Sequence, residues 1–354
     1  MSKLSFRGWL LSAAAVVSAA TSASAQSPYI ERAEAIFNDG ATPFIQPIDH
    51  ESIDFGTENL IIRGQDEEDF SLDLSDLFED SCLDIGGWVQ AGYTSRSTGL
   101  FNTRPNRVEF HQVWMYAEIA TDGSEGLDIG GRVDFMYGTD AGNTQAFGNN
   151  PGRWDFQNGF DNGPDASGYG FAIPQAYAEL AYHDLTVKIG HFYTLLGYEV
   201  VTAPDNFFYS HAFTMNNSEA FTHTGALASY AVNDDITLHG GWTLGWDTGF
   251  DQLNKGSSFL GGASVAMTDD FTVTYILTAG KLGWLGEGYS HSVVGDWSIT
   301  EDLNYVVQSD LVTTNAAVFG GTTYHTVGLN QYLLYSLTDE VGVGARGEWW
   351  KANG

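Results

Sequence analysis

Two adjacent segments, at 172–183 and 185–196, show the most regular alternation of apolar and polar residues in the chain. In the second, apolar residues fall on one face, while polar or small residues, among them Lys188, fall on the other. A period of two predicts β-strands with one apolar face. A tight break at His183-Asp184 separates the two segments, and a long non-periodic stretch at 197–223 follows them. A membrane β-barrel repeats this unit of strand, short turn, strand and long loop.

Similar segments recur along the chain, and most have the length of about ten residues that a tilted strand needs to cross a bilayer. The expected strands are 84–94, 107–119, 127–137, 172–183, 185–196, 224–232, 236–246, 258–267, 271–280, 289–299, 303–313, 323–337 and 341–350. Short acidic turns alternate with longer connections, which lie at 95–106, 138–171, 197–223, 247–257, 281–288 and 314–322. The pattern predicts an all-β fold, a transmembrane antiparallel up-and-down β-barrel with turns in the periplasm and loops outside.

A soluble β-sandwich is the alternative architecture, because its strands also alternate. A sandwich gives no reason for all long loops to gather at one end, so the asymmetry of the connections favours the barrel. Aromatic residues near strand ends fit the girdles of a membrane barrel. They are Tyr137, Tyr182, Trp242, Trp246 and Trp349.

The number of expected strands, about 13, is odd, whereas bacterial single-chain barrels use an even number. The chain ends just after a strand, at Gly354. We therefore expect 14 to 16 strands in the complete barrel and a barrel domain at 81–354 that is C-terminally incomplete.

The first 25 residues have the order of a secretory signal peptide. Lys3 and Arg7 precede an apolar core, and Ala23-Ser24-Ala25 is a small-x-small cleavage site. Residues 26–80 hold 15 acidic and 2 basic residues without a sustained period. They predict an acidic periplasmic arm or linker, which we favour over a plug.

Composition narrows the class of protein further. No run of eighteen apolar residues follows the signal peptide, which excludes a helical membrane protein. The many aromatic residues (22 Phe, 17 Tyr and 10 Trp) and the 42 Gly fit strands that face lipid on one side. The single cysteine, Cys82, forms no disulfide within the chain. A net charge of −31 argues against a nucleic-acid partner.

The loop at 197–223 is the expected pore constriction, because its aromatic groups need burial that an extracellular tip does not give. These groups are Phe207, Phe208, Tyr209 and Phe213. The longer loop at 138–171 is the competing constriction, although its Gly, Asn and Asp content suits solvent. A lid formed by both loops over the mouth is a further alternative.

Charged residues of this loop and of the inner strand faces are the candidate pore-lining set. The loop carboxylates are Glu199, Asp205 and Glu219, and the facing cations are Arg132, Lys188 and, on a less regular strand, Arg107. Asp134 shares the polar face of its strand with Arg132. The net charge of residues 81–354, with 30 acidic and 10 basic residues, predicts a modest cation preference.

The sequence gives weaker support for metal binding or catalysis. His211 and His223 share the central loop with Asp205 and Glu219, but no ligand spacing supports a metal site. Ser210-His211 and His291-Ser292 are adjacent pairs whose side chains point to opposite faces of a strand, and no GxSxG motif appears. We therefore expect no enzyme, no metal and no cofactor, and we retain two alternatives, an adhesin or structural barrel and an outer-membrane lipid hydrolase.

Several blocks of the chain are specific enough to compare with known families. They are GGRVDFMYGTDA (130–141), PQAYAEL (174–180), VKIGHFYTLLGYEVV (187–201), APDNFFYSHAFTM (203–215), FTHTGALASY (221–230) and GWTLGWDTGFD (241–251). Together they resemble the OmpL-like β-barrel porin family typical of planctomycete bacteria. The resemblance implies a Gram-negative outer-membrane porin and supplies no substrate. Opposed charges across a narrow pore suit small polar solutes, so we expect passive diffusion of small hydrophilic solutes or ions. The expected partners are outer-membrane lipid and these solutes, with a homotrimer as the expected assembly.

Overall fold

The computed structural model describes residues 50–55, 60–62, 70–72, 83–96, 101–102, 104–146, 168–315, 323–338 and 341–353. The expected signal peptide, most of the acidic segment 26–80, Cys82, and residues 147–167 and 316–322 of two long loops lie outside the described residues.

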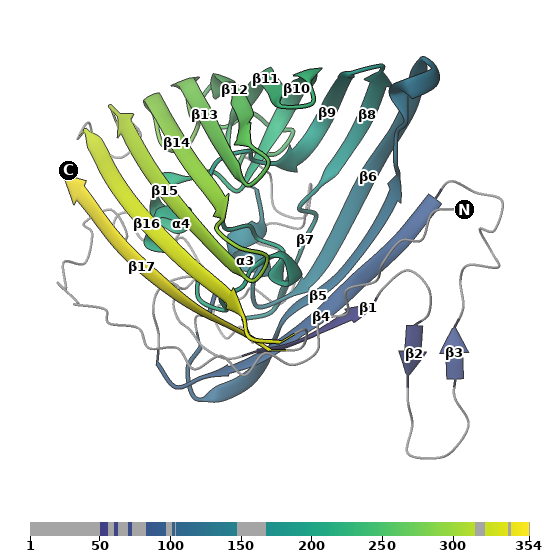
Figure 1. The fold of residues 1–354 in the computed structure, drawn as a ribbon, viewed down its shortest axis with the longest axis vertical. Helices are drawn as coiled ribbons and strands as arrows, with labels where there is room; N and C mark the ends of the chain where they lie inside the picture. Colours follow the sequence, from purple (N-terminus) through teal and green to yellow (C-terminus); the bar gives the residue numbers. More distant parts are fainter. Residues whose placement is uncertain are drawn as a thin grey trace.

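Fourteen antiparallel strands form one curved sheet, in which each strand pairs with the next along the path (Figure 1). The strands are β1 (His50–Phe55), β4 (Leu83–Thr94), β5 (Arg107–Ile119), β6 (Leu127–Gly138), β8 (Ala176–Tyr182), β9 (Leu185–Tyr193), β10 (Thr222–Asn233), β11 (Ile236–Trp246), β12 (Ser257–Thr268), β13 (Phe271–Lys281), β14 (Glu287–Ser298), β15 (Leu303–Thr314), β16 (Tyr324–Ser336) and β17 (Gly342–Asn353). A short strand, β7 (Gly170–Ala172), pairs with the end of β6, and β2 (Leu60–Ile62) pairs with β3 (Phe70–Leu72).

The expected all-β fold and its thirteen strands are confirmed, and the bounds of β5 and β11 match the prediction. The expected strand at 172–183 divides into β7 and β8, because Pro174 between them has no amide hydrogen to donate to a ladder. The fourteenth strand, β1, comes from the acidic segment and pairs with β4. The division of the chain at residue 80 stays a prediction.

Short turns join the strands at one end, as the sequence predicts. Three of them leave only two residues between the last paired positions: Tyr182 pairs with Leu185, Asn233 with Ile236 and Thr268 with Phe271. In the β8–β9 turn, His183 has a φ of 50°, the left-handed conformation favoured in the commonest two-residue hairpin turns.

Alternation separates an apolar outer face from a polar inner face. On β6, Leu127, Ile129 and Val133 are exposed, whereas Asp134 is fully buried. The same arrangement holds on β16, where Leu329 is exposed and Asn330 is buried. An apolar face turned outward is what lipid contact requires. Within the described residues, no helix combines the length and apolar character needed to cross a membrane.

The prediction that Trp246 belongs to an aromatic girdle is wrong. Gly245, with a φ of 109°, interrupts the alternation at the end of β11, so Trp246 turns inward. Its indole is buried and donates to the Thr278 hydroxyl at 3.0 Å. Tyr182, Trp242 and Trp349 remain exposed, as a girdle requires.

The buried apolar side chains lie inside the curve of the sheet. One cluster joins inner-face residues of β10 to β13, including Leu260 and Ile276, to Leu282 and Leu285 from the β13–β14 connection and to Leu196. The short helices α3 (Ala141–Thr144) and α4 (Phe213–Ser218) also lie in the space that the sheet surrounds (Figure 1). The barrel interior is therefore partly filled by its own connecting segments.

Candidate functional site

The connection between β9 and β10, residues 194–221, crosses the interior of the sheet. It contains the 3-10 helix η3 (Ala203–Asp205) and helix α4. The loop leaves from strands in the middle of the sheet path, yet its hydrogen bonds reach β5 near one end of the path and β16 and β17 at the other. We call it the β9–β10 loop. The expectation that it folds inward is confirmed.

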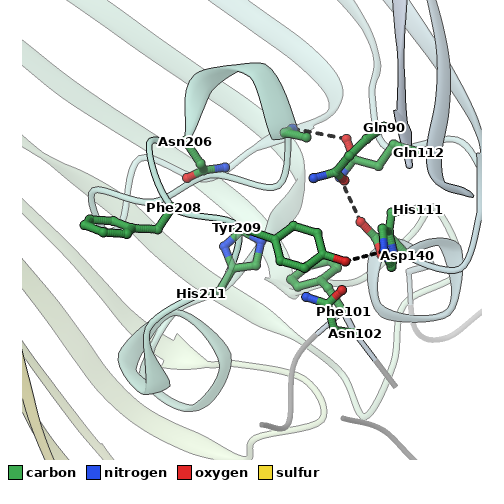
Figure 2. A pocket seen from close by; sticks show the side chains of 11 residues that line it. Gln90, Phe101, Asn102, His111, Gln112, Asp140, Asn206, Phe208, Tyr209 and His211 are labelled. Atoms are coloured by element: carbon green, nitrogen blue, oxygen red, sulfur yellow. Dashed lines mark hydrogen bonds and ion pairs between the residues drawn. The ribbon is translucent and has the colours of Figure 1, made fainter. Parts of the chain in front are cut away.

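Gln112 of β5 fixes one side of the loop (Figure 2). Its amide nitrogen donates to the Val201 carbonyl at 2.8 Å, and its amide oxygen accepts from the Ala203 backbone N–H at 3.1 Å. The same side chain bonds Trp88 and Asp140, at 2.9 and 3.0 Å. This part of the loop lies outside the β-sheet, and the Gln112 side chain satisfies two of its backbone groups.

A second contact on β5 joins Tyr209 to His111, with 2.5 Å between the hydroxyl and Nε2. His111 Nδ1 lies 2.8 Å from the Thr139 hydroxyl. A cavity of about 10 Å³ lies among these groups and is lined mainly by polar side chains (Figure 2). A space of this size suits a single water molecule rather than a solute.

Replacing Gln112 with Ala is expected to lower the unfolding free energy by roughly 3 kcal/mol, because several buried polar partners lose their hydrogen bonds. Chemical denaturation in detergent measures the change. Gln331→Ala is the matched control, since Gln331 lies on the exposed face of β16 and accepts only from Tyr305 among the bonds of the described residues. The control should change stability by no more than about 0.5 kcal/mol. Equal losses in the two variants would contradict the anchoring role.

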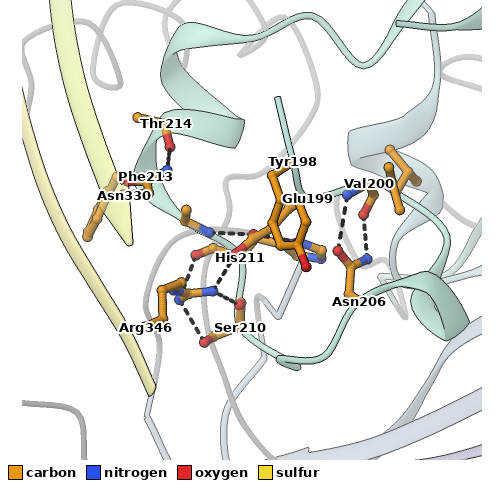
Figure 3. A network of polar contacts seen from close by, with 12 residues as sticks. Tyr198, Glu199, Val200, Asn206, Ser210, His211, Phe213, Thr214, Asn330 and Arg346 are labelled. Atoms are coloured by element: carbon orange, nitrogen blue, oxygen red, sulfur yellow. Dashed lines mark hydrogen bonds and ion pairs between the residues drawn. The ribbon is translucent and has the colours of Figure 1, made fainter. Parts of the chain in front are cut away.

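Arg346 of β17 fixes the opposite side of the loop (Figure 3). Its guanidinium donates to Glu199 at 2.8 Å, to the Ser210 hydroxyl at 2.9 Å and to the His211 carbonyl at 3.2 Å. It also donates to the Ser210 carbonyl. One side chain therefore holds two separate stretches of the loop together.

The second oxygen of Glu199 accepts from the Ala212 backbone N–H at 2.7 Å and lies 3.3 Å from His211 Nδ1. Burial by itself raises the pKa of Glu199, but the Arg346 guanidinium and His211 together lower it to about 2. The carboxylate is therefore ionised throughout the physiological range.

Helix α4 lies against the inner face of β16 and contacts Glu348 and Trp350 of β17. The Phe213 N–H donates to Glu348 at 2.7 Å, and Ser218 shares a hydrogen bond of 2.8 Å with Thr326. Asn330 donates to the Thr214 hydroxyl (Figure 3). Residues of α4 thus satisfy polar groups that would otherwise face an open lumen.

The end of the loop brings a second carboxylate to the wall. Glu219 accepts from the Gln308 side-chain amide of β15 at 2.5 Å, and the same nitrogen donates to Asp310 at 2.7 Å. A Cβ at Gly197, where φ is 85°, would collide with the Glu219 carboxylate. A glycine at this position therefore permits the close approach of the two ends of the loop.

The structure divides the predicted site residues into separate groups. Glu199 and Glu219 lie inside the barrel, whereas Asp205 is exposed at the end of η3 and accepts from the Thr202 hydroxyl at 2.5 Å. Arg107 is exposed at the start of β5. Lys188 lies 3.7 Å from Glu179 on the neighbouring strand.

Arg132 pairs within its own wall, with Glu118 at 3.0 Å and Asp134 at 2.6 Å. The sequence predicts that the loop carboxylates face Arg132 and Lys188 across the pore. This prediction is wrong for Glu199, which forms its ion pair with Arg346. Sequence reasoning missed Arg346, although the alternation of β17 places it on the face opposite the exposed Trp349.

The expected burial of the loop aromatics holds for three of four groups. Phe208 and Tyr209 are buried, and the partly buried Phe207 packs against Phe208, with 5.0 Å between the ring centroids. Phe213 is 46% exposed: its ring stacks on Trp350 of β17, with 6.4 Å between the ring centroids, and its other face remains accessible.

A polar cavity of about 460 Å³ remains inside the barrel near the short turns. Its wall comes from β13, β14 and β15 and from the β12–β13 turn, and residues 197–198 of the β9–β10 loop border it. Acidic and hydroxyl groups dominate the lining, including Asp269, Asp270, Asp296, Thr272, Thr274 and Ser298. The β9–β10 loop therefore borders a polar space in the interior of the barrel.

An antiparallel barrel sheet with an apolar outer face, a polar interior and an inward-folded loop defines the class of outer-membrane β-barrel channels. The chain belongs to the family described as "Putative beta-barrel porin-2, OmpL-like", which matches residues 82–354. The family is one of porins rather than of enzymes, and the expected OmpL-like resemblance is confirmed.

No curated protein matches the chain. Among solved structures, a mutant of the Rh. blastica porin is 12% identical, with a TM-score of 0.40, and the match covers 76% of this chain and 97% of that chain. OccK8 (OprE) of Pseudomonas aeruginosa is 12% identical, with a TM-score of 0.39, and covers 76% and 64%. The outer membrane channel DcaP of Acinetobacter baumannii is 10% identical, with a TM-score of 0.33, and covers 76% and 97%.

Proposed function

We propose that this porin lets small hydrophilic solutes or ions diffuse passively through a water-filled lumen that the β9–β10 loop narrows. The observation that carries the proposal is the crossing of the lumen by this loop, with Gln112 on one side and Arg346 on the other. The polar cavity of about 460 Å³ next to the loop supplies room for a hydrated solute.

Swelling of proteoliposomes in isotonic solutions of sugars of increasing size tests the proposal. Entry of small sugars, with a sharp size limit, is the expected result. Deleting the loop should move that limit upward. Vesicles that hold folded protein and never swell would instead favour an adhesive or structural barrel.

We expect the pore to prefer cations. Among the described residues, Arg132 and Lys188 both have carboxylate partners, whereas Asp269 and Asp270 of the β12–β13 turn and Asp296 of β14 have no ion pair. Carboxylates without counter-charges raise the local cation concentration, an effect that salt screens.

The reversal potential under a gradient of potassium chloride measures this preference. The triple variant D269N/D270N/D296N should lose much of the cation preference at low salt and keep the size limit. Glu301→Gln, in an exposed turn, is the matched control for the removal of a carboxylate. Anion preference in the unmodified protein at low salt would contradict the expectation.

The same proposal includes the location of the protein, the roles of its N-terminal segments and its assembly. Residues 1–25 serve as a signal peptide that directs the chain to the outer membrane of a Gram-negative cell, and residues 26–80 form mainly a periplasmic arm. The exposed apolar face contacts outer-membrane lipid, and the assembly is a homotrimer. The planctomycete type of the family is supported by the sequence blocks at 130–251.

A further inference from the structure

Two carboxyl groups meet beneath the end of the β9–β10 loop. Glu219 belongs to the loop and Asp310 to the inner face of β15, and their exposed fractions are 4% and 1%. Gln308 lies between them and donates one N–H to each, at 2.5 and 2.7 Å. We call Glu219, Gln308 and Asp310 the carboxyl latch.

The surroundings of the latch supply hydroxyl and amide groups rather than a cation. Ser292 of β14, which accepts from the Gly197 N–H at 3.3 Å, lies opposite Asp310 in the register, and Tyr332 of β16 faces both Glu199 and Glu219. The Gln308 amide oxygen accepts from the Tyr198 N–H at 3.2 Å, which fixes the orientation of the amide.

The basic side chains on the strands and loop that surround the carboxyl latch do not pair with Glu219 or Asp310. Arg346 pairs with Glu199, and Lys351 lies exposed on β17. His211 lies beside Glu199. Two carboxylates in a site of this kind cannot both be ionised without a large penalty.

The physical consequence is that the closed arrangement binds a proton. Burial raises the pKa of Glu219 well above its ordinary value, and the Asp310 carboxylate raises it further, while the Gln308 hydrogen bond opposes the rise. Because the pair interacts strongly, the proton belongs to the pair rather than to either oxygen alone.

We propose that the carboxyl latch is a proton-dependent closure of the pore, a step that rests on the pore function proposed above. A proton on one of the two carboxyl groups leaves the pair with a single negative charge, so that Gln308 holds Glu219 and the end of the β9–β10 loop on β15. When that proton leaves to bulk water, the two carboxylates repel, Glu219 leaves the wall, and the loop releases part of the lumen.

The direction follows from linkage. The closed state has the higher carboxyl pKa, so its stabilisation is complete below the ordinary pKa of a glutamate and is lost as the pH rises through the raised value. The pore is therefore narrow in acid and wide toward alkaline pH. The Glu199–Arg346 pair stays ionised across this range and does not contribute to the change.

Glu219→Gln tests the latch because glutamine keeps the size and the acceptor oxygen but cannot ionise. Asp310→Asn removes the same charge from the wall and serves as a second variant should the first fail to fold. Glu301→Gln, an exposed turn carboxylate, is the control that should keep the response of the unmodified protein. Heat-modifiable gel mobility establishes folding for each protein.

The first measurement is single-channel conductance between about pH 5 and about pH 8. The unmodified protein and the Glu301→Gln control should conduct at least about twofold more at the higher pH, whereas both latch variants should give one low value throughout. Equal conductance of the unmodified protein at the two pH values would overturn the latch and leave the pore proposal intact. A rise that persists in both latch variants would also overturn it.

The second measurement does not depend on conduction. Cysteine replaces the buried Ser218 after Cys82 is changed to Ser, and the rate of maleimide labelling is compared with and without Glu219→Gln at each pH. The two rates should agree near pH 5, and the chain with Glu219 should label at least about tenfold faster near pH 8. Equal rates at both pH values would overturn the latch. The expected labelling change in a protein that never conducts would support the latch and reject the pore.

Closure at fixed pH that disappears on addition of a divalent-metal chelator would overturn the proposal in another way. That result would show that a cation rather than a proton neutralises the two carboxylates.

Discussion

Replacing residues 203–219 with a short Gly-Ser linker is expected to raise single-channel conductance several-fold while the barrel remains folded. The segment contains η3 and α4 and includes the hydrogen bonds to His111, Asn330 and Thr326. Its removal opens the lumen between β5 and β16. Conductance grows with the narrowest cross-section of a pore, so the segment that crosses the lumen should dominate it.

A deletion of equal length within the loop 138–171 is the matched control. We expect a much smaller change, because 197–223 is the predicted constriction. Heat-modifiable mobility of both proteins would establish that the barrels still fold. A larger effect from the 138–171 deletion, or unchanged conductance without residues 203–219, would show that the β9–β10 loop is not the constriction.

Arg346→Ala is expected to lower the unfolding free energy by roughly 3–5 kcal/mol, the range typical for breaking a buried ion pair by removing one partner. Glu199 and Arg346 have side-chain exposures of only 6% and 11%, so the remaining carboxylate would be buried without its cation. Denaturation midpoints in detergent measure the loss. Lys188→Ala should have a smaller effect, because Lys188 and Glu179 are more exposed, at 37% and 19%.

The double variant Arg346→Ala with Glu199→Gln separates charge from packing. Neutralising Glu199 removes the uncompensated charge, so the double variant should be more stable than Arg346→Ala alone. No recovery would mean that Arg346 acts only through its hydrogen bonds to Ser210 and His211.

The Glu199–Arg346 ion pair should also affect the stability of the protein at low pH. Because the pKa of Glu199 is lowered to about 2 from the ordinary 4.5, the stabilisation is complete above the ordinary value and is lost as the pH falls toward about 2. In Arg346→Ala this part of the acid destabilisation should be absent. Denaturation midpoints along this range measure both proteins, and parallel curves would contradict the assignment.

The strands were predictable because alternation and turn chemistry are local properties. The segment 107–119 alternates imperfectly, yet its flanking turn and loop define its bounds, and β5 occupies the same residues. In contrast, β1 has six residues in an acidic segment, and its stability depends on pairing with β4 rather than on its own pattern. Tertiary pairing of this kind leaves no local signal.

The candidate site was predictable in part. The need to bury Phe208 and Tyr209 predicted the inward fold of the loop, since apolar area drives burial wherever it lies in the sequence. The partner of Glu199 was not predictable from the loop, because Arg346 lies 147 residues away. The inner-face position of Arg346 was visible in the alternation of β17, but its pairing required the register of the whole sheet.

The pairing of Glu219 and Asp310 through Gln308 could not be predicted from the sequence either. The sequence marked Glu219 as a pore carboxylate, whereas Asp310 is one of many polar residues on the inner faces of strands. Their approach follows from the path of the loop across the lumen, which alternation alone does not specify.

Recording from planar lipid bilayers that contain the folded protein tests the central claim most directly. The predicted result is a series of discrete, uniform conductance steps, with a reversal potential that indicates cation preference at low salt. Protein that shows heat-modifiable mobility and a β-rich spectrum in detergent, yet gives no steps across a wide voltage range at acidic and alkaline pH, would contradict a pore function.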